Sequence, residues 1–327
     1  MINKKPSASL PLSTVSGSQK TVFGHAGAMT TIKSLYDQGN LAPCWIVWGQ
    51  RGIGKSTLAY QLAREILSAN PQNPNGLSPE IVGRQIANGA YPNLFVLTRG
   101  NNKDGDLNTV ISVEDSRKVI DFLRQSPSIP GWRVVIIDAV DDLTRQAANA
   151  LLKILEEPPQ KALILLICHS LGQALPTIRS RCQKLLCQPL TAADFLDWCP
   201  DFDEGLFPLV RGSIGLYQSL QAAGGGIFVQ QLDEMAMAAR SNNFPKAQKW
   251  CETVAKNPSQ YDCFLWLIEQ WAYQKILNST DTEQSHWLGV WQAVTSFLKD
   301  ARSTHLDKTH VLITCFLMIE NPTRIIE

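Results

Sequence analysis

The sequence contains no apolar run that approaches the roughly 18 residues needed to cross a bilayer. Its longest apolar run, from Ala162 to Cys168, has the length of a single strand. Lys4 and Lys5 are not followed by an apolar core, so the beginning of the chain does not have the pattern of a secretory signal. These absences predict a protein without membrane segments that works in the cytoplasm.

The sequence also lacks a strong charge of either sign, since 30 Lys and Arg residues nearly balance 29 Asp and Glu residues and leave a net charge of +1. Such a chain does not coat nucleic acid through its overall field, so any DNA contact must be a local patch or belong to an assembly. The basic residues between positions 99 and 133 form either such a patch or an ordinary solvated surface: Arg99, Lys103, Arg117, Lys118, Arg124 and Arg133.

No two cysteines have CxxC spacing, and their positions fit no usual zinc site, so we expect no zinc. Without a secretion signal, reduced thiols packed as small apolar side chains are expected. The eight cysteines are Cys44, Cys168, Cys182, Cys187, Cys199, Cys251, Cys263 and Cys315.

Short apolar runs alternate with helical patterns over the first two thirds of the sequence. One amphipathic stretch has apolar residues at helical spacing from Leu143 to Leu155. Buried strands separated by helices are typical of a parallel sheet covered on both faces, which predicts an α/β domain. The expected strands are Trp45–Trp48, Leu94–Leu97, Val134–Ile137, Leu163–Ile167 and Leu185–Cys187.

Composition changes along the chain predict four regions. Residues 1–20 are rich in Ser, Pro and Lys, as in a disordered tail, and residues 21–189 form the α/β domain. Residues 190–226 form a small helical unit that ends at three consecutive glycines, Gly224 to Gly226, which suit a hinge or linker. Residues 227–327 form an all-helical domain whose tryptophans are expected in its core.

A complete G-x-x-x-x-G-K-S motif occupies residues 49–56, directly after one predicted strand and before a helical stretch, Thr57–Leu67. Glycines let several backbone N–H groups converge on phosphate oxygens at a helix N-terminus. Lys55 is expected to reach the β- and γ-phosphates, and the Ser56 hydroxyl to bind Mg²⁺. The alternative is a chance match in a glycine-rich turn. The predicted ligand is ATP or ADP, bound by Gly49, Gly52, Ile53, Gly54, Lys55, Ser56, Thr57 and Asp138.

Asp138 ends the apolar strand 133–138, as expected of a Walker B segment that holds Mg²⁺ together with Ser56, although it could merely end the strand. Active ATPases with such a P-loop and acidic strand usually have glutamate at the next position, where it activates water, but this chain has Ala139. A positioned base supplies about 10²–10⁴ in rate. Unless Asp141 or Asp142 substitutes, the site is predicted to bind ATP and hydrolyse it slowly or not at all.

Two further segments carry a resemblance. Residues 148–159 read A-N-A-L-L-K-I-L-E-E-P-P, and residues 175–182 read L-P-T-I-R-S-R-C. With the glycine motif and the acidic strand, they resemble the AAA+ clamp-loader family of bacterial DNA polymerase III over about 140 residues. The resemblance implies a P-loop parallel-sheet domain, a small helical lid and an all-α C-terminal collar. It also implies a hetero-pentamer with gamma/tau-type and delta-type subunits, a sliding clamp and primed DNA held by the assembly.

Three departures from the gamma/tau pattern favour the delta-prime branch of that family. Residues 68–93 contain no cysteine, whereas gamma/tau subunits have a four-cysteine zinc module there. The Walker B glutamate is replaced by Ala139, and Gly215 stands where active loaders place the sensor-2 arginine. The intact glycine motif departs from delta-prime proteins that have lost theirs.

By the same resemblance, Arg181 is the arginine finger that reaches the ATP of a neighbouring subunit, although taken alone it reads as an ordinary surface arginine. His169 and Ser170 fall near the sensor-1 position, and either, or neither, contacts nucleotide there. Glu156 and Glu157 are adjacent at a helix end, cannot both face one site, and are expected to be solvated or interfacial.

Two other functions remain as alternatives. One is an autonomous P-loop enzyme, such as a DNA-dependent motor or a nucleotide kinase. The other is an autonomous AAA+ ATPase that acts on DNA in recombination or repair. An autonomous ATPase should retain both the glutamate and the sensor arginine, so Ala139 and Gly215 favour a subunit whose own hydrolysis is weak or absent.

Overall fold

The computed structural model describes residues 22–69, 78–100, 108, 110–241, 243–301 and 306–320. By its internal contacts the chain divides at Asp201 into two compact units. We call the described residues 22–200 the sheet unit and the described residues 201–320 the helical unit. The predicted tail at residues 1–20 lies outside the described residues.

The sheet unit contains one five-stranded sheet with the order β2-β3-β4-β1-β5, in which each neighbouring pair is parallel. All seven residues of β4 are buried, because this strand has neighbours on both edges and helices on both faces. The predicted α/β class is confirmed. The strands are β1 Cys44–Trp48, β2 Leu94–Thr98, β3 Arg133–Asp138, β4 Ala162–Cys168 and β5 Gln183–Leu186.

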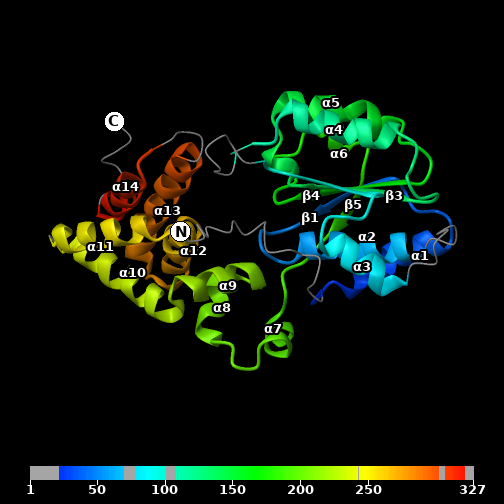
Figure 1. The fold of residues 1–327 in the computed structure, drawn as a ribbon. Coiled ribbons are helices and arrows are strands. Elements are labelled where there is room, and N and C mark those ends of the chain that lie inside the picture. The colour runs from blue at the N-terminus through cyan, green and yellow to red at the C-terminus, as the bar shows by residue number, and fades with distance from the viewer. Residues whose placement is uncertain are drawn as a thin grey trace, which may run out of the picture. The chain divides into compact units, whose positions relative to one another are not determined.

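Helices cover both faces of this sheet, and each face has its own core (Figure 1). On one face lie α1 (Ala26–Asp37), α2 (Lys55–Ser68) and α3 (Pro79–Ala87). On the other lie α4 (Val113–Arg124), α5 (Arg145–Glu156) and the short α6 (Pro176–Arg179). The apolar stripe predicted between residues 143 and 155 lies in α5 except for Leu143, which precedes the helix. Helix α5 buries five residues: Ala147, Ala148, Leu151, Ile154 and Leu155.

Side chains at the helix starts explain several of these boundaries. The Ser112 hydroxyl caps α4 by accepting from the Asp115 N–H, and Thr144 caps α5 by accepting from the Ala147 N–H. Thr191 and Asp194 form a capping box at α7 (Ala192–Trp198), the last helix of the sheet unit. A 3₁₀ turn, η1 (Val140–Asp142), connects β3 to α5.

The helical unit consists of packed helices around aromatic side chains. Trp271 and Trp287 are buried and meet edge to face, with ring centroids 5.4 Å apart, as the predicted core role requires. Trp250 is half-buried and stacks on Phe228 at 5.5 Å. The elements are η2 (Glu204–Leu206), α8 (Phe207–Val210), α9 (Ile214–Ala223), α10 (Gly225–Arg240), α11 (Phe244–Lys256), α12 (Pro258–Asn278), α13 (Asp281–Ala301) and α14 (Lys308–Glu320).

The division at Asp201 differs from the boundaries predicted at residues 189 and 226. Helix α7 belongs to the sheet unit, whereas α8 and α9 belong with the later helices. Gly224 ends α9 at a φ of 124°, and α10 begins at the next residue. Gly224 is therefore the junction between two helices of one unit, while Gly225 and Gly226 belong to α10. The predicted lid and collar boundaries stay a prediction.

Within the described part of the chain, no helix is both long and apolar enough to span a bilayer. All eight cysteines are free thiols, and seven of them are buried, with Cys199 half-buried. The cysteines therefore pack as the small apolar side chains that their spacing suggested.

Candidate functional site

Residues 49–56, the glycine loop, connect β1 to α2 at the carboxyl edge of the sheet. Gly49 has a φ of 150°, and a Cβ at this position would lie 2.3 Å from the carbonyl oxygen of Cys187. Gly54 has a left-handed φ of 98° and is the N-cap of α2. Both positions therefore require glycine, because a side chain would clash at the first and strain the backbone at the second.

The Lys55 side chain closes this loop from inside. Its Nζ donates to the carbonyl oxygens of Gly49 at 2.7 Å and Gln50 at 2.6 Å. Only 3% of Lys55 is exposed. Burial lowers the pKa of the ammonium group to about 8, although nearby Cys187, Asp138 and Asp141 oppose this shift. The buried ammonium thus has one positive charge to offer an anion at the loop.

Ser56 and Asp138, the two predicted magnesium ligands, lie within hydrogen-bonding distance of each other. Asp138 is the last residue of β3, and Ser56 belongs to the first turn of α2. Burial raises the pKa of Asp138, while the hydrogen bond with Ser56 and the charge of Lys55 lower it. A hydroxyl and a carboxylate at this spacing are oxygen ligands of the kind that Mg²⁺ prefers.

The remaining predicted loop residues have different surroundings. Ile53 is buried in the core on the α2 face, Gly52 has a φ of 79°, and Thr57 is half-buried in α2. The carbonyl oxygen of Ile53 lies 2.7 Å from Nε2 of His25, a buried residue at the start of α1. This histidine contact was not predicted, because His25 is 28 residues away in sequence and belongs to no motif.

Ala139 lies in the core rather than at the surface of the site. It is 1% exposed and packs in the core on the α2 face. The next two acidic residues in the sequence have other partners. Asp142 lies 3.2 Å from Nε of Arg99, and Asp141 accepts hydrogen bonds from the two residues that follow β4. Neither carboxylate has the contacts expected of a substitute base.

Asp141 fixes the segment in which a sensor residue was expected. Its carboxylate accepts from the backbone N–H of His169 at 2.6 Å and of Ser170 at 3.1 Å. Burial, together with the positive charges of Lys55 and Arg51, lowers the pKa of the His169 imidazole to about 3. His169 is therefore neutral at pH 7 and close to the glycine loop, whereas Ser170 is exposed.

Replacing Asp141 with alanine should destabilise the sheet unit by about 2 kcal/mol, because two backbone N–H groups lose a charged acceptor. Asp142→Ala is the matched control and should cost under about 1 kcal/mol, since its ion pair with Arg99 is partly exposed. Urea unfolding measures both losses. Equal losses for the two variants would show that Asp141 does not anchor β4.

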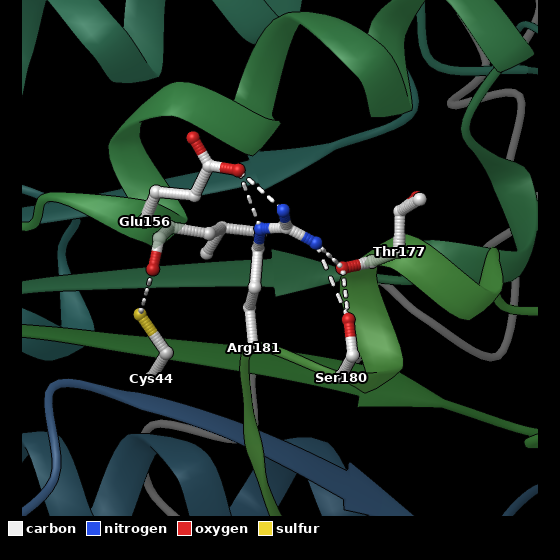
Figure 2. A network of polar contacts seen from close by, with 6 residues as sticks. Cys44, Glu156, Thr177, Ser180 and Arg181 are labelled. Atoms are coloured by element: carbon white, nitrogen blue, oxygen red, sulfur yellow. Dashed lines mark hydrogen bonds and ion pairs between the residues drawn. The ribbon is translucent and has the colours of Figure 1, made fainter.

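Arg181 lies beyond α6 and is held by its own unit (Figure 2). Its Nε donates to Oε1 of Glu156 at 2.8 Å, and Nη2 donates to the same oxygen. Its Nη1 donates to the carbonyl oxygen of Thr177 at 2.8 Å and to Oγ of Ser180 at 3.2 Å. Glu156, expected to be solvated or interfacial, is exposed and forms an ion pair within the chain, and Glu157 is exposed as well.

Arg181 and the glycine loop lie at opposite ends of the parallel strands. Strand β5 starts just after Arg181, with Gln183 paired to Trp45 at the beginning of β1, whereas the glycine loop follows Trp48 at the end of β1. With about 3.3 Å per strand residue, Arg181 lies about 20 Å from Gly49 along the strand direction. Arg181 therefore cannot serve the glycine loop of its own chain.

Several of the basic residues between positions 99 and 133 have partners within the chain. Arg99 pairs with Asp142, and Lys118 pairs with Asp115 at 2.7 Å. Arg133 is buried and donates to the carbonyl oxygen of Phe122 at 3.2 Å. Arg117 and Arg124 are exposed, and Lys103 lies outside the described residues. These contacts favour the interpretation as an ordinary surface.

Gly215, at the predicted sensor-2 position, lies in the first turn of α9 in the helical unit. The fold thus gathers the glycine loop, Ser56, Asp138 and the neutral His169 at the carboxyl edge of the sheet. It places Arg181 at the amino edge.

Comparison with known proteins agrees with these motifs. The model of the family described as "DNA polymerase III, delta subunit" matches residues 24–191, which is half of the chain and most of the sheet unit. This match includes the glycine loop, the acidic strand and Arg181.

Individual relatives belong to the same group. A DNA polymerase III subunit delta' of Pseudomonas aeruginosa is 33% identical over 48% of this chain and 46% of its own length. A DNA polymerase III subunit delta' of Yersinia pestis is 37% identical over 40% of this chain and 37% of its own length. A DNA polymerase III subunit gamma of Buchnera aphidicola is 31% identical over 50% of this chain and 43% of its own length. The chain thus spans less than half the length of these relatives.

The match over half of the chain, together with the ordered motifs in the sheet unit, identifies the family. The chain belongs to the DNA polymerase III, delta subunit family of clamp-loader proteins.

Proposed function

We propose that this chain is a delta-prime-type subunit of the DNA polymerase III clamp loader. It joins gamma/tau-type and delta-type subunits in a cytoplasmic hetero-pentamer that loads a sliding clamp on primed DNA. It binds ATP or ADP with Mg²⁺ at the glycine loop, hydrolyses it little or not at all, and offers Arg181 to the ATP of a neighbouring subunit.

The position of Arg181 carries this proposal. A guanidinium group suits a phosphate because it is always charged and has a rigid fork of donors. Arg181 lies at the amino edge of the sheet, about 20 Å from its own glycine loop along the strands. A nucleotide that it contacts must therefore belong to another subunit.

The residues at the carboxyl edge fit a magnesium nucleotide. The loop follows a buried strand, caps a 14-residue helix, and holds a buried ammonium group beside it. Ser56 and Asp138 are close enough to share one cation. Ser56 and Asp138 would hold Mg²⁺, which would neutralise phosphate charge, and Lys55 and the backbone of the loop would orient the phosphates.

Weak hydrolysis at this site follows from Ala139 and its neighbours. A methyl group buried in the core cannot activate water, and the carboxylates of Asp141 and Asp142 have other partners. Loss of a positioned base removes about 10²–10⁴ in rate. The nucleotide in this subunit then acts as a structural ligand.

The intact glycine loop also supports the second function, an autonomous AAA+ ATPase that acts on DNA in recombination or repair. Such an enzyme would turn over ATP alone, with a base near Asp138. The buried methyl group of Ala139 at that position favours the clamp-loader function.

Reconstitution tests the proposed function. Mixed with gamma/tau-type and delta-type subunits of the same organism, the chain should enter one stable complex whose ATP turnover is stimulated by clamp and primed DNA. The chain alone should show little turnover. Failure to enter a complex, together with DNA-stimulated turnover by the isolated chain, would favour the autonomous ATPase.

A further inference from the structure

Most of the N–H donors of the Arg181 guanidinium group already have acceptors within the chain. A guanidinium group has five N–H donors, one on Nε and two on each terminal nitrogen. Glu156 accepts one from Nε and one from Nη2, while Thr177 and Ser180 accept from Nη1. Among the contacts of the described residues, these four bonds leave one N–H on Nη2 for a ligand.

The acceptors of Arg181 stand on fixed parts of the sheet unit. Glu156 is the last residue of α5, and Leu155 before it is buried. The Leu155 carbonyl oxygen accepts from Sγ of Cys44 at 3.9 Å, which connects the end of α5 to the start of β1 (Figure 2). On the other side, Ile178 in α6 is fully buried. The backbone that carries both acceptors is therefore fixed, and the Glu156 carboxylate and the Thr177 carbonyl contact the guanidinium group through different nitrogens.

We propose that Glu156 is a positioning residue for Arg181. Its carboxylate fixes the plane of the guanidinium group, so that the remaining Nη2 donor is already oriented when a neighbouring subunit brings its triphosphate. This inference rests on the proposed function, because it requires Arg181 to act on a neighbour's nucleotide.

Charge and exposure indicate that Glu156 orients Arg181 rather than holds it in an inactive position. The side chain of Glu156 is 48% exposed and that of Arg181 is 32% exposed, so water screens the attraction between them. A screened carboxylate cannot hold the arginine away from a more highly charged phosphate. It can remove rotamers from a long side chain, and a catalytic donor held in the correct geometry gains rate.

The test is ATP turnover in the reconstituted complex, stimulated by clamp and primed DNA, at the site that receives Arg181. Glu156→Ala should lower kcat at this site about tenfold, with little change in KM, because a misoriented donor costs transition-state stabilisation. Glu156→Gln retains an acceptor oxygen at the same position and should recover much of the loss. Glu157→Ala removes the adjacent, exposed charge and should leave turnover unchanged.

The double variant Glu156→Ala/Arg181→Ala separates positioning from a general structural effect. Glu156→Ala should add nothing to the loss caused by Arg181→Ala, because its effect passes through that residue. Three results would overturn positioning while leaving the proposed function intact: unchanged turnover in Glu156→Ala, faster turnover, or an equal loss with and without Arg181. Unchanged turnover in Arg181→Ala itself would overturn the proposed function, and positioning with it.

Discussion

Replacing Arg181 with alanine should slow ATP hydrolysis at the neighbouring site by at least about a hundredfold, or about 2.7 kcal/mol. Arginine fingers supplied in trans contribute about 10³–10⁵ in other phosphoryl-transfer systems. The change removes a guanidinium group that lies at the amino end of the strands, where it cannot reach the glycine loop of its own chain.

The measurement is single-turnover hydrolysis in the assembled complex, with the other ATP sites silenced by substitution of their own P-loop lysines. Lys184→Ala is the matched control, because it removes an exposed positive charge from β5, the strand that Arg181 precedes. Both variants should assemble normally, and only the Arg181→Ala complex should hydrolyse ATP slowly. Unchanged hydrolysis in an intact Arg181→Ala complex contradicts the role in trans.

Replacing Lys55 with alanine should weaken nucleotide binding by the isolated chain by about a hundredfold, close to 2.7 kcal/mol. The ammonium group is buried within the glycine loop, where a charge interacts with phosphate more strongly than in water. Isothermal titration with ATP and Mg²⁺ measures the change. Equal affinity of the wild type and the Lys55→Ala variant would show that the glycine loop does not bind the nucleotide.

The same lysine makes binding depend on pH. Its pKa in the unliganded chain is about 8, whereas bound phosphates favour the charged form and raise that pKa. Binding is thus strongest below pH 8, where the ammonium is already charged, and weakens as pH rises through 8 towards 9. Residual binding by Lys55→Ala should show no such inflection. A wild-type affinity that is constant from pH 7 to 9 contradicts a lysine contact.

Much of the fold could be predicted from the sequence because its strands are central and buried. The predicted runs at residues 134–137 and 163–167 lie within β3 and β4. Neighbouring strands and helices bury these residues, and burial favours apolar side chains. The edge strand was harder to place. The prediction began at Leu185, whereas β5 begins at Gln183, because Gln183 and Lys184 face solvent and carry no apolar signal.

The candidate site was predictable where a motif is contiguous and not where folding joins distant residues. The glycine motif indicated Lys55 and Ser56 directly. The contact of Glu156 with Arg181 spans 25 residues, and that of Asp141 with His169 spans 28. Glu156 has the sequence pattern of an exposed helix end. Only the parallel topology, which returns the end of α5 and the start of β5 to the same edge, brings it to Arg181.

The most direct test of the central claim compares two complexes, one with Lys55→Ala and one with Lys55→Ala/Arg181→Ala. Hydrolysis should occur at the neighbouring site, so the Lys55→Ala complex should retain most of its stimulated single-turnover rate. Adding Arg181→Ala should then lower that rate by about a hundredfold or more. Loss of hydrolysis with Lys55→Ala alone, in an intact complex, would show that this chain hydrolyses its own ATP and would contradict the proposed role of Arg181 in trans.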